Sequence, residues 1–184
     1  DGKLKTASFD TTQGFGLRSV SGETHGYAHA SELSEAAIKR AAETVKAVQA
    51  GRGGKLDVGP RGTNKQLYKP DNPIALVPFE AKVDVLQQID AYARAKDPRV
   101  KQVMASVSGS WQAIEIIRGD GNRVADIRPL VRLNVTVMVE QNGRMETGSH
   151  GSGGRITYES LLEPEHWKGS VDEAIRQALV NLDS

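Results

Sequence analysis

The sequence predicts an α+β fold, a largely antiparallel sheet with about three helices packed on one face. The first observation is an alternation between Val131 and Val139, with apolar residues at every second position, typical of a strand with one face on a core. The second is Asn142-Gly143, which suits the two positive-φ positions of a type I′ hairpin turn. The third is the order of elements: strands, helix, helix, strands, helix. The apolar set of the alternation is Val131, Leu133, Val135, Val137 and Val139.

Three short strands are predicted near the N-terminus, over residues 3–9, 14–21 and 24–30. Ser21-Gly22-Glu23 supplies a tight turn between the last two strands. Because short strands and tight turns follow one another, these segments indicate an antiparallel meander.

Two helices are predicted in the first hundred residues. Ser34 is the expected N-cap of the first helix, and Gly51 is its expected C-terminal stop. The second helix covers residues 79–96 and ends before Pro98. Between the helices, residues 51–78 contain five glycines and four prolines and predict a long exposed loop.

A run of strands is predicted in the second half of the chain. Strands over residues 100–108 and 111–118 are expected to meet at a turn at Ser108-Gly109-Ser110. Another turn at residues 120–122 precedes the long alternating strand. After Asn142-Gly143 the return strand should run into a flexible glycine-rich loop, residues 148–154.

The last helix is expected to open at Ser170-Val171-Asp172-Glu173, which has the pattern of a capping box. Its buried stripe would be Val171, Ala174, Ile175, Ala178, Leu179 and Leu182. We expect one domain over residues 1–184, without an internal repeat.

Composition argues against several classes of function. The 24 basic and 23 acidic residues give a net charge of +1, so nothing in the charge predicts a nucleic-acid partner. The sequence contains no run of eighteen apolar residues, so no membrane span is predicted. It also shows no charged-then-apolar leader. The absence of cysteine excludes disulfides and thiol chemistry and fits a cytoplasmic protein. The chain begins at Asp1, and neither end has the pattern of a natural terminus, so we expect a fragment.

Gly148 to Arg155 is the strongest candidate binding segment. Its glycine amides could form a concave nest for a phosphate, a carboxylate or a peptide carbonyl. A P-loop is not indicated, because no Gly-Lys-Ser/Thr is present. A mobile loop or bulged strand that needs glycine for its backbone angles explains the segment equally well. The candidate residues are Gly151, Gly153, Gly154 and Arg155.

Two arginines of the long strand, Arg128 and Arg132, are the other candidates for substrate binding. They share a parity opposite to the valine face, so both could pair with a carboxylate through their guanidinium groups. Ordinary salt bridges to Asp126 or Glu115 are the simpler interpretation, and we favour it slightly.

Histidine and serine give no predicted catalytic centre. His25 and His29 share a strand face, but four residues along a strand span about 13 Å, too far for one metal ion. Ser108 lies at a predicted turn, but no Gly-x-Ser-x-Gly marks a nucleophile. The sequence therefore predicts no catalytic residue and no metal ligand in this chain.

Four stretches resemble the TldD branch of the TldD/PmbA family, the bacterial and archaeal zinc metallopeptidases also called modulators of DNA gyrase. They are Gln13-Gly-Phe-Gly-Leu-Arg-Ser-Val-Ser-Gly-Glu-Thr-His-Gly-Tyr-Ala-His-Ala30, Asp126-Ile-Arg-Pro-Leu-Val-Arg-Leu-Asn-Val135, Gly148 to Glu159 with its Gly-Gly-Arg-Ile-Thr-Tyr-Glu, and Glu173-Ala-Ile-Arg-Gln-Ala-Leu-Val-Asn-Leu182. Each is weak alone. Together they follow the family's order, span nearly the whole chain and are fairly specific.

The resemblance implies the N-terminal domain of a TldD-like protein, without its catalytic C-terminal domain. The family's zinc motif, a His-Glu-x-x-x-His helix, would lie just beyond Ser184. Zinc would then be the cofactor of the intact protein, which hydrolyses small or unfolded peptides, while the fragment holds no zinc and is inactive. The implied partner is a zinc-free PmbA-like or TldE-like subunit, or a second copy.

We expect such a domain to guide peptide substrates and to pair subunits. An exposed strand edge can hold peptides of varied sequence by adding them as an extra strand, so the long hairpin and its glycine-rich rim are the candidates. Two alternatives stay open. One is a non-catalytic scaffold, as in the partner subunit. The other is an anion-binding or nucleotide-binding module that uses Gly148 to Arg155.

Overall fold

The computed structural model describes residues 2–48 and 66–184. Contacts within the chain define two compact units, one of residues 1–5 and 63–184 and one of residues 6–62. We call them the large unit and the small unit and describe each by itself. The sequence patterns predict one domain over residues 1–184 and do not indicate this division. Each unit has its own sheet, and each sheet is covered by its own helices.

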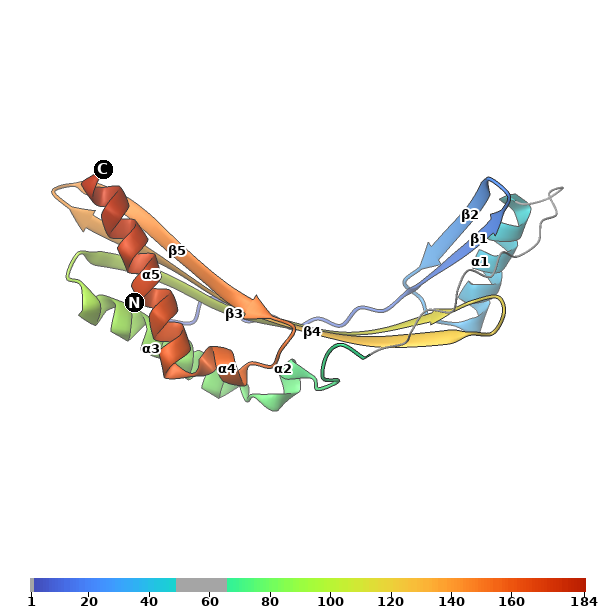
Figure 1. The fold of residues 1–184 in the computed structure, drawn as a ribbon, viewed down its shortest axis with the longest axis horizontal. Helices are drawn as coiled ribbons and strands as arrows, with labels where there is room; N and C mark the ends of the chain where they lie inside the picture. The colour runs from blue at the N-terminus through green and yellow to red at the C-terminus, as the bar shows by residue number, and fades with distance from the viewer. Residues whose placement is uncertain (1, 49–65) are drawn as a thin grey trace. The chain divides into compact units, whose positions relative to one another are not determined.

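The small unit is a two-stranded sheet covered by one helix (Figure 1). β1, Phe15–Ser21, pairs antiparallel with β2, Thr24–Ala30, as predicted. Gly22 has φ 58°, which suits the first central position of a type II′ turn. The helix α1, Glu35–Val48, packs on this sheet.

Ser34 caps α1 as predicted, because its hydroxyl accepts the backbone N–H of Ala37 at 3.1 Å. Ala37, Ala41 and Val45 form the buried face of the helix. The predicted stop at Gly51 lies outside the described residues.

The large unit contains a three-stranded antiparallel sheet in the order β3-β4-β5 (Figure 1). Its strands are β3, Val100–Ile117, β4, Arg123–Gln141, and β5, Arg144–Gly154. Asn142 and Gly143 have φ values of 55° and 80°, so the predicted type I′ turn is confirmed.

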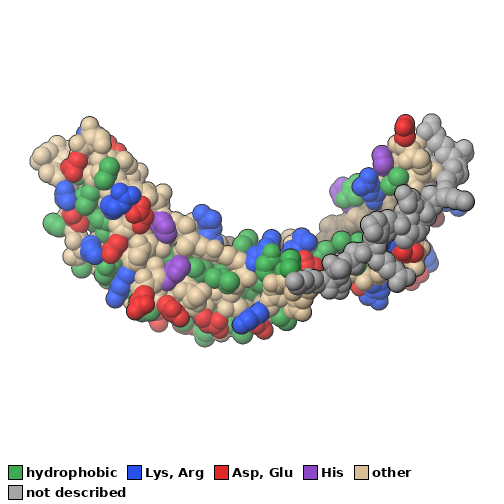
Figure 2. Space-filling model, in the orientation of Figure 1, with side chains coloured by type: hydrophobic (Ala, Val, Ile, Leu, Met, Phe, Trp, Pro, Cys, Tyr) green, Lys and Arg blue, Asp and Glu red, His purple; other side chains and the backbone are tan. Residues whose placement is uncertain are grey.

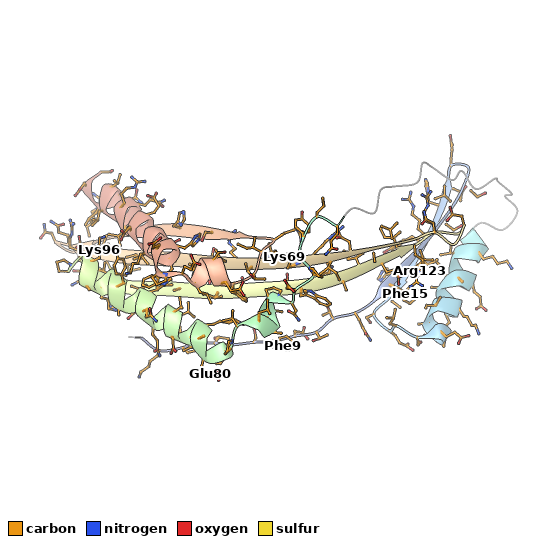
Figure 3. The ribbon with its side chains drawn as sticks, turned by 60° about the horizontal axis from the view of Figure 1, so that its bottom comes forward. Phe9, Phe15, Lys69, Glu80, Lys96 and Arg123 are labelled. Atoms are coloured by element: carbon orange, nitrogen blue, oxygen red, sulfur yellow. The ribbon has the colours of Figure 1, made fainter. Side chains whose placement is uncertain are left out.

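Helices α3, Phe79–Lys96, and α5, Pro164–Asp183, lie on the same face of this sheet (Figure 1). Charges at the two ends of α3, Glu80 and Lys96, complement the helix dipole (Figure 3). Two short helices, α2, Pro73–Leu76, and α4, Glu159–Leu162, complete the unit. The α+β prediction is therefore confirmed, with three long helices packed on antiparallel sheets.

The main core lies between the three-stranded sheet and its two long helices. The predicted apolar parity of β4 is confirmed, since each of its five residues is at most 1% exposed. Opposite it pack the buried residues Ile89, Ala93, Trp167, Val171, Ala174, Ile175, Ala178 and Leu182. A smaller cluster joins Val131 to Tyr158 and Leu161.

Two strand predictions are wrong. Residues 3–9 form no strand, because no described strand pairs with them and alternation alone does not satisfy backbone groups. The turn predicted at Ser108-Gly109-Ser110 is also absent, because β3 stays paired with β4 through it. A Cβ at Gly109 would lie 2.8 Å from the ring carbon Cζ of Tyr158, so glycine here makes room for that side chain.

The glycine-rich segment is not a flexible loop. Residues 148–154 belong to β5 and pair in register with residues 131–137 of β4. The last helix also begins earlier than predicted, at Pro164 instead of Ser170. Ser170 is a buried residue inside α5, and its hydroxyl donates to the carbonyl of His166 at 3.4 Å. Proline is favoured in the first turn of a helix, which explains the earlier start.

The predicted loop, residues 51–78, is corrected in part. Residues 51–65 lie outside the described residues. Residues 73–76 form α2, and the side chain of Asn72 accepts the N–H of Ile74 at 3.0 Å as its N-cap. Asparagine before proline is a helix-start signal that the sequence analysis did not use.

Candidate functional site

The candidate site lies along β5, an edge strand of the three-stranded sheet. Within the described ranges, β5 pairs on one side with β4 and with no strand on the other. An edge strand presents backbone N–H and C=O groups that can pair with another chain. The side chains of α5 decide how much of this edge is accessible.

Two contacts from α5 show which backbone groups of β5 turn outward. The N–H of Ser149 donates to Oε1 of Gln177 at 3.4 Å, and the carbonyl of Thr147 accepts from Nδ2 of Asn181 at 3.0 Å. In an antiparallel pair, alternate residues turn their backbone groups toward the partner strand. Gly151 and Gly153 therefore share the outward orientation of Thr147 and Ser149.

The edge is thus divided into two parts. Gln177 and Asn181 cover it at residues 147–149. Among the described residues, no side chain caps the outward N–H and C=O groups of Gly151 and Gly153. The accessible part of the edge therefore coincides with the glycine-rich end of β5.

Arg132 lies beside this accessible part, on the sheet face that carries no helix. Its Nε donates to Oδ1 of Asn134 at 2.7 Å, which holds the guanidinium across Gly151. A Cβ at Gly151 would lie 2.7 Å from Nη2 of Arg132 and 2.6 Å from Oδ1 of Asn134. Gly151 therefore lets the guanidinium lie close against the strand, next to the unpaired backbone of the edge.

Only half of the predicted site residues come together. Arg132, Gly151 and Gly153 share one face at neighbouring register positions. Gly154 lies on the opposite, helix-facing side of β5, since it pairs with the buried Val131.

The other two predicted residues have partners elsewhere. Arg128 pairs with Asp126 at 2.6 Å, so the ion-pair interpretation of this arginine is confirmed. Arg155 follows the strand, and its guanidinium carbon lies 5.3 Å from the centre of the Tyr68 ring. Glu115, the alternative partner for Arg128, binds Nε of Arg123 at 2.7 Å.

The polar residues of α5 that contact the edge were not among the predicted site residues. Glu173 binds Arg176 through two hydrogen bonds of 2.8 Å and accepts from Gln177 at 2.8 Å. Hydrogen bonds from Arg176, then from Gln177, lower the pKa of Glu173 to about 2. Gln177 is thereby oriented toward Ser149. The i+3 and i+4 spacing of Arg176 and Gln177 from Glu173 was the available signal.

Two histidines lie on the helix-facing side of β5. Nε2 of His166 lies 2.9 Å from the hydroxyl of Ser152, whereas Nδ1 of His150 is buried without a hydrogen-bond partner in the described structure. The described residues contain no group of three or more His, Cys, Asp or Glu side chains placed to hold a metal ion. None of their helices is long and apolar enough to cross a membrane.

The chain matches two family models. Residues 72–182 match the PmbA/TldA metallopeptidase central domain, and residues 1–49 match domain 1 of the same metallopeptidases. Two similar curated proteins are named metalloprotease TldD homologs. The one from Haemophilus influenzae is 40% identical over the whole chain, and the one from Buchnera aphidicola of Schizaphis graminum is 35% identical. The chain spans 40% of the length of each.

Solved structures share the fold at low sequence identity. TldE from Thermococcus kodakarensis matches with a TM-score of 0.72 and 15% identity, over 97% of this chain and 40% of its own. A modulator of DNA gyrase from Thermotoga maritima, described as putative, matches with a TM-score of 0.71 and 18% identity, over 95% of this chain and 40% of its own. Because the central-domain model covers more than half of the chain, the chain belongs to the TldD/PmbA family of metallopeptidases.

Proposed function

We propose that this chain guides peptide substrates and pairs subunits within a TldD-like zinc metallopeptidase of the cytoplasm. Residues 1–184 would form its N-terminal part, with residues 1–49 similar to domain 1 and residues 72–182 similar to the central domain of the family. The catalytic residues and zinc would lie in a C-terminal domain outside them. The substrates would be small or unfolded peptides. The partner would be a PmbA-like or TldE-like subunit, or a second copy.

The observation that carries the proposal is the accessible backbone at Gly151 and Gly153. An extended peptide can add to this edge through main-chain hydrogen bonds, which do not depend on its sequence. A peptidase acting on varied unfolded peptides needs this kind of contact.

Arg132 supplies the second element of the proposal. Its guanidinium lies across Gly151, so it is placed to pair with a carboxylate on a peptide bound at the edge. The residues proposed to bind substrate are therefore Arg132, Gly151 and Gly153. The other three predicted residues are not proposed to contact the peptide. Gly154 lies on the opposite face of the strand, and the side chains of Arg128 and Arg155 contact other residues.

The test compares two substitutions at Gly151. Gly151→Pro removes the outward N–H, whereas Gly151→Ala adds the same Cβ and keeps the N–H. Prolines are tolerated at edge positions whose N–H faces solvent, so both variants should fold. Circular dichroism checks this, and fluorescence anisotropy of a labelled Thr-Val repeat decapeptide measures binding to residues 1–184.

We expect Gly151→Pro to bind the peptide about 3–10-fold more weakly than Gly151→Ala, because one hydrogen bond is worth roughly 0.5–1.5 kcal/mol. Equal affinities of the two variants would contradict the proposal. So would wild-type protein that does not bind the decapeptide at millimolar concentration.

A non-catalytic scaffold is the second candidate, because the fold is shared with a protein named TldE. Zinc content of the full-length protein distinguishes the two. About one zinc ion per chain supports the metallopeptidase, and its absence supports the scaffold. An anion nest at Gly148 to Arg155 has no geometric support, because a nest needs successive amides on one side and an extended strand alternates them.

A further inference from the structure

The small unit contains a groove between β2 and α1. Its volume is about 400 Å³, within the range of ligand pockets of roughly 300–1,000 Å³. Residues 27–30 form one wall, and Ala37, Arg40, Ala41 and Thr44 of α1 form the other. The walls therefore consist of a strand edge and a helix face, both rich in alanine.

α1 approaches β2 closely at Gly26, next to the groove. A Cβ at Gly26 would lie 3.0 Å from both Cγ1 and the carbonyl oxygen of Val45, so glycine permits contact there. Toward Ala30 and Ala37 the facing side chains are methyl groups. These are too short to fill the space between strand and helix, which leaves room for a side chain from outside.

The hairpin geometry turns backbone groups of β2 away from β1, toward the outer edge of the sheet. Ser21 and Thr24 flank a two-residue turn and form the hydrogen-bonded pair that closes it. By the same register, Ala28 turns its N–H and C=O groups toward Leu17 of β1. Tyr27 and His29 turn theirs away from β1. No strand of the described chain pairs with this side of β2.

One basic side chain lies at the groove. Arg40 lines the groove, and its side chain remains 65% exposed although Nη2 contacts Glu32 at 3.2 Å. Figure 2 shows basic, acidic, histidine and apolar side chains together on the surface of this unit. A guanidinium presents five N–H donors, so Arg40 can bind a second carboxylate beside Glu32.

We propose that this groove binds an extended peptide that carries a carboxylate. The peptide adds as a third strand to the outer edge of β2 and pairs with Tyr27 and His29. A small apolar side chain of the peptide enters between the alanines of β2 and α1, and its carboxylate binds Arg40. This site lies in the other unit from the β5 edge, so it does not rest on the proposed function.

The first test blocks the groove without changing the buried core. Thr44 is exposed and lines the groove, so Thr44→Trp fills it. Ala42 is exposed on the same helix outside the groove, so Ala42→Trp is the matched control. The probe is a fluorescein-labelled peptide, Gly-Ser-Thr-Ala-Val with a free C-terminus, added to residues 1–184. We expect Thr44→Trp to weaken binding at least about tenfold and Ala42→Trp to leave it unchanged.

Amide hydrogen exchange locates the bound peptide. Saturating peptide should slow exchange at Tyr27 and His29, whereas Ala28 is already paired within the hairpin and should change little. Protection at Gly151 and Gly153 alone would assign binding to β5 and overturn this inference while supporting the proposed function. An affinity that is insensitive to Thr44→Trp, or no binding at millimolar peptide, would also overturn it.

The second test concerns the carboxylate. Arg40→Gln should weaken binding about 3–10-fold, in the range of a hydrogen bond to a charged group in an exposed setting. Glu32→Gln should leave binding equal or stronger, because it removes a competing carboxylate. Two further peptides identify the carboxylate that binds. Amidation of the C-terminus removes the terminal carboxylate, and an amidated peptide with Asp in place of Ser carries only a side-chain carboxylate. Equal binding of all three peptides would contradict the role of Arg40.

Discussion

At Gly148, α5 packs directly against the sheet, and replacing this glycine with alanine tests the packing of the large unit. A Cβ at this position would lie 2.5 Å from the backbone nitrogen of Ala178 and closer still to the carbonyl oxygen of Ala174. It would also lie 2.9 Å from Cβ of Gln177. Two of these three contacts are helix backbone atoms, which cannot rotate away.

The size of the effect follows from this geometry. To restore an ordinary van der Waals separation, α5 must move away from β5 by roughly 1 Å. That movement loosens the contacts of Val171, Ala174 and Ala178, each 0% exposed. Overpacking of cores typically costs 1–3 kcal/mol, and because backbone must move we expect Gly148→Ala to cost about 3 kcal/mol. Domains of this size are stable by only about 5–15 kcal/mol.

Urea unfolding followed by tryptophan fluorescence measures this loss. Both tryptophans, Trp111 and Trp167, belong to the large unit, so the signal reports on that unit. The matched control is Gly169→Ala, inside α5 with nothing within 4 Å of its added Cβ. It should stabilise the unit by up to about 1 kcal/mol through helix propensity. An unchanged urea midpoint for Gly148→Ala would refute the close-packing argument.

Two further predictions concern charge and the core of the large unit. Glu173 has its pKa lowered from 4.5 to about 2, so its stabilising effect is present above about pH 4.5 and is lost as the pH falls toward 2. Urea unfolding at several pH values should therefore show that Glu173→Gln costs stability at pH 7 but little near pH 2, and a constant difference would contradict the pKa shift. Replacing Val135, which is 0% exposed, with alanine should lower the free energy of unfolding by about 2–3 kcal/mol, because a cavity remains. The control Ser106→Ala, on the exposed face of β3, should change the free energy of unfolding by no more than about 0.5 kcal/mol. Similar losses for both variants would show that β4 is not the centre of the core.

The two proposed peptide sites follow the same physical principle in separate units. Each is an unpaired strand edge with a helix beside it and an arginine within reach. The difference lies in what the helix does. In the large unit, Gln177 and Asn181 of α5 cover part of the β5 edge. In the small unit, the alanines of α1 leave the β2 edge accessible.

The sequence by itself determined the elements whose signals are local. The helix over residues 79–96 has the predicted bounds, and the type I′ turn lies at Asn142-Gly143. The buried parity of β4 and the Ser34 cap are also as predicted. These features depend on residues within a few positions of one another, where periodicity, capping and turn chemistry act directly.

Only the tertiary structure decided the candidate site. The glycines of residues 148–154 have the composition of a loop, but pairing with β4 makes them a strand. The accessible end of that strand depends on Gln177 and Asn181, about thirty residues away in sequence. The β2 groove likewise depends on how closely α1 approaches at Val45. These outcomes are set by contacts between segments distant in the chain, which local patterns do not specify.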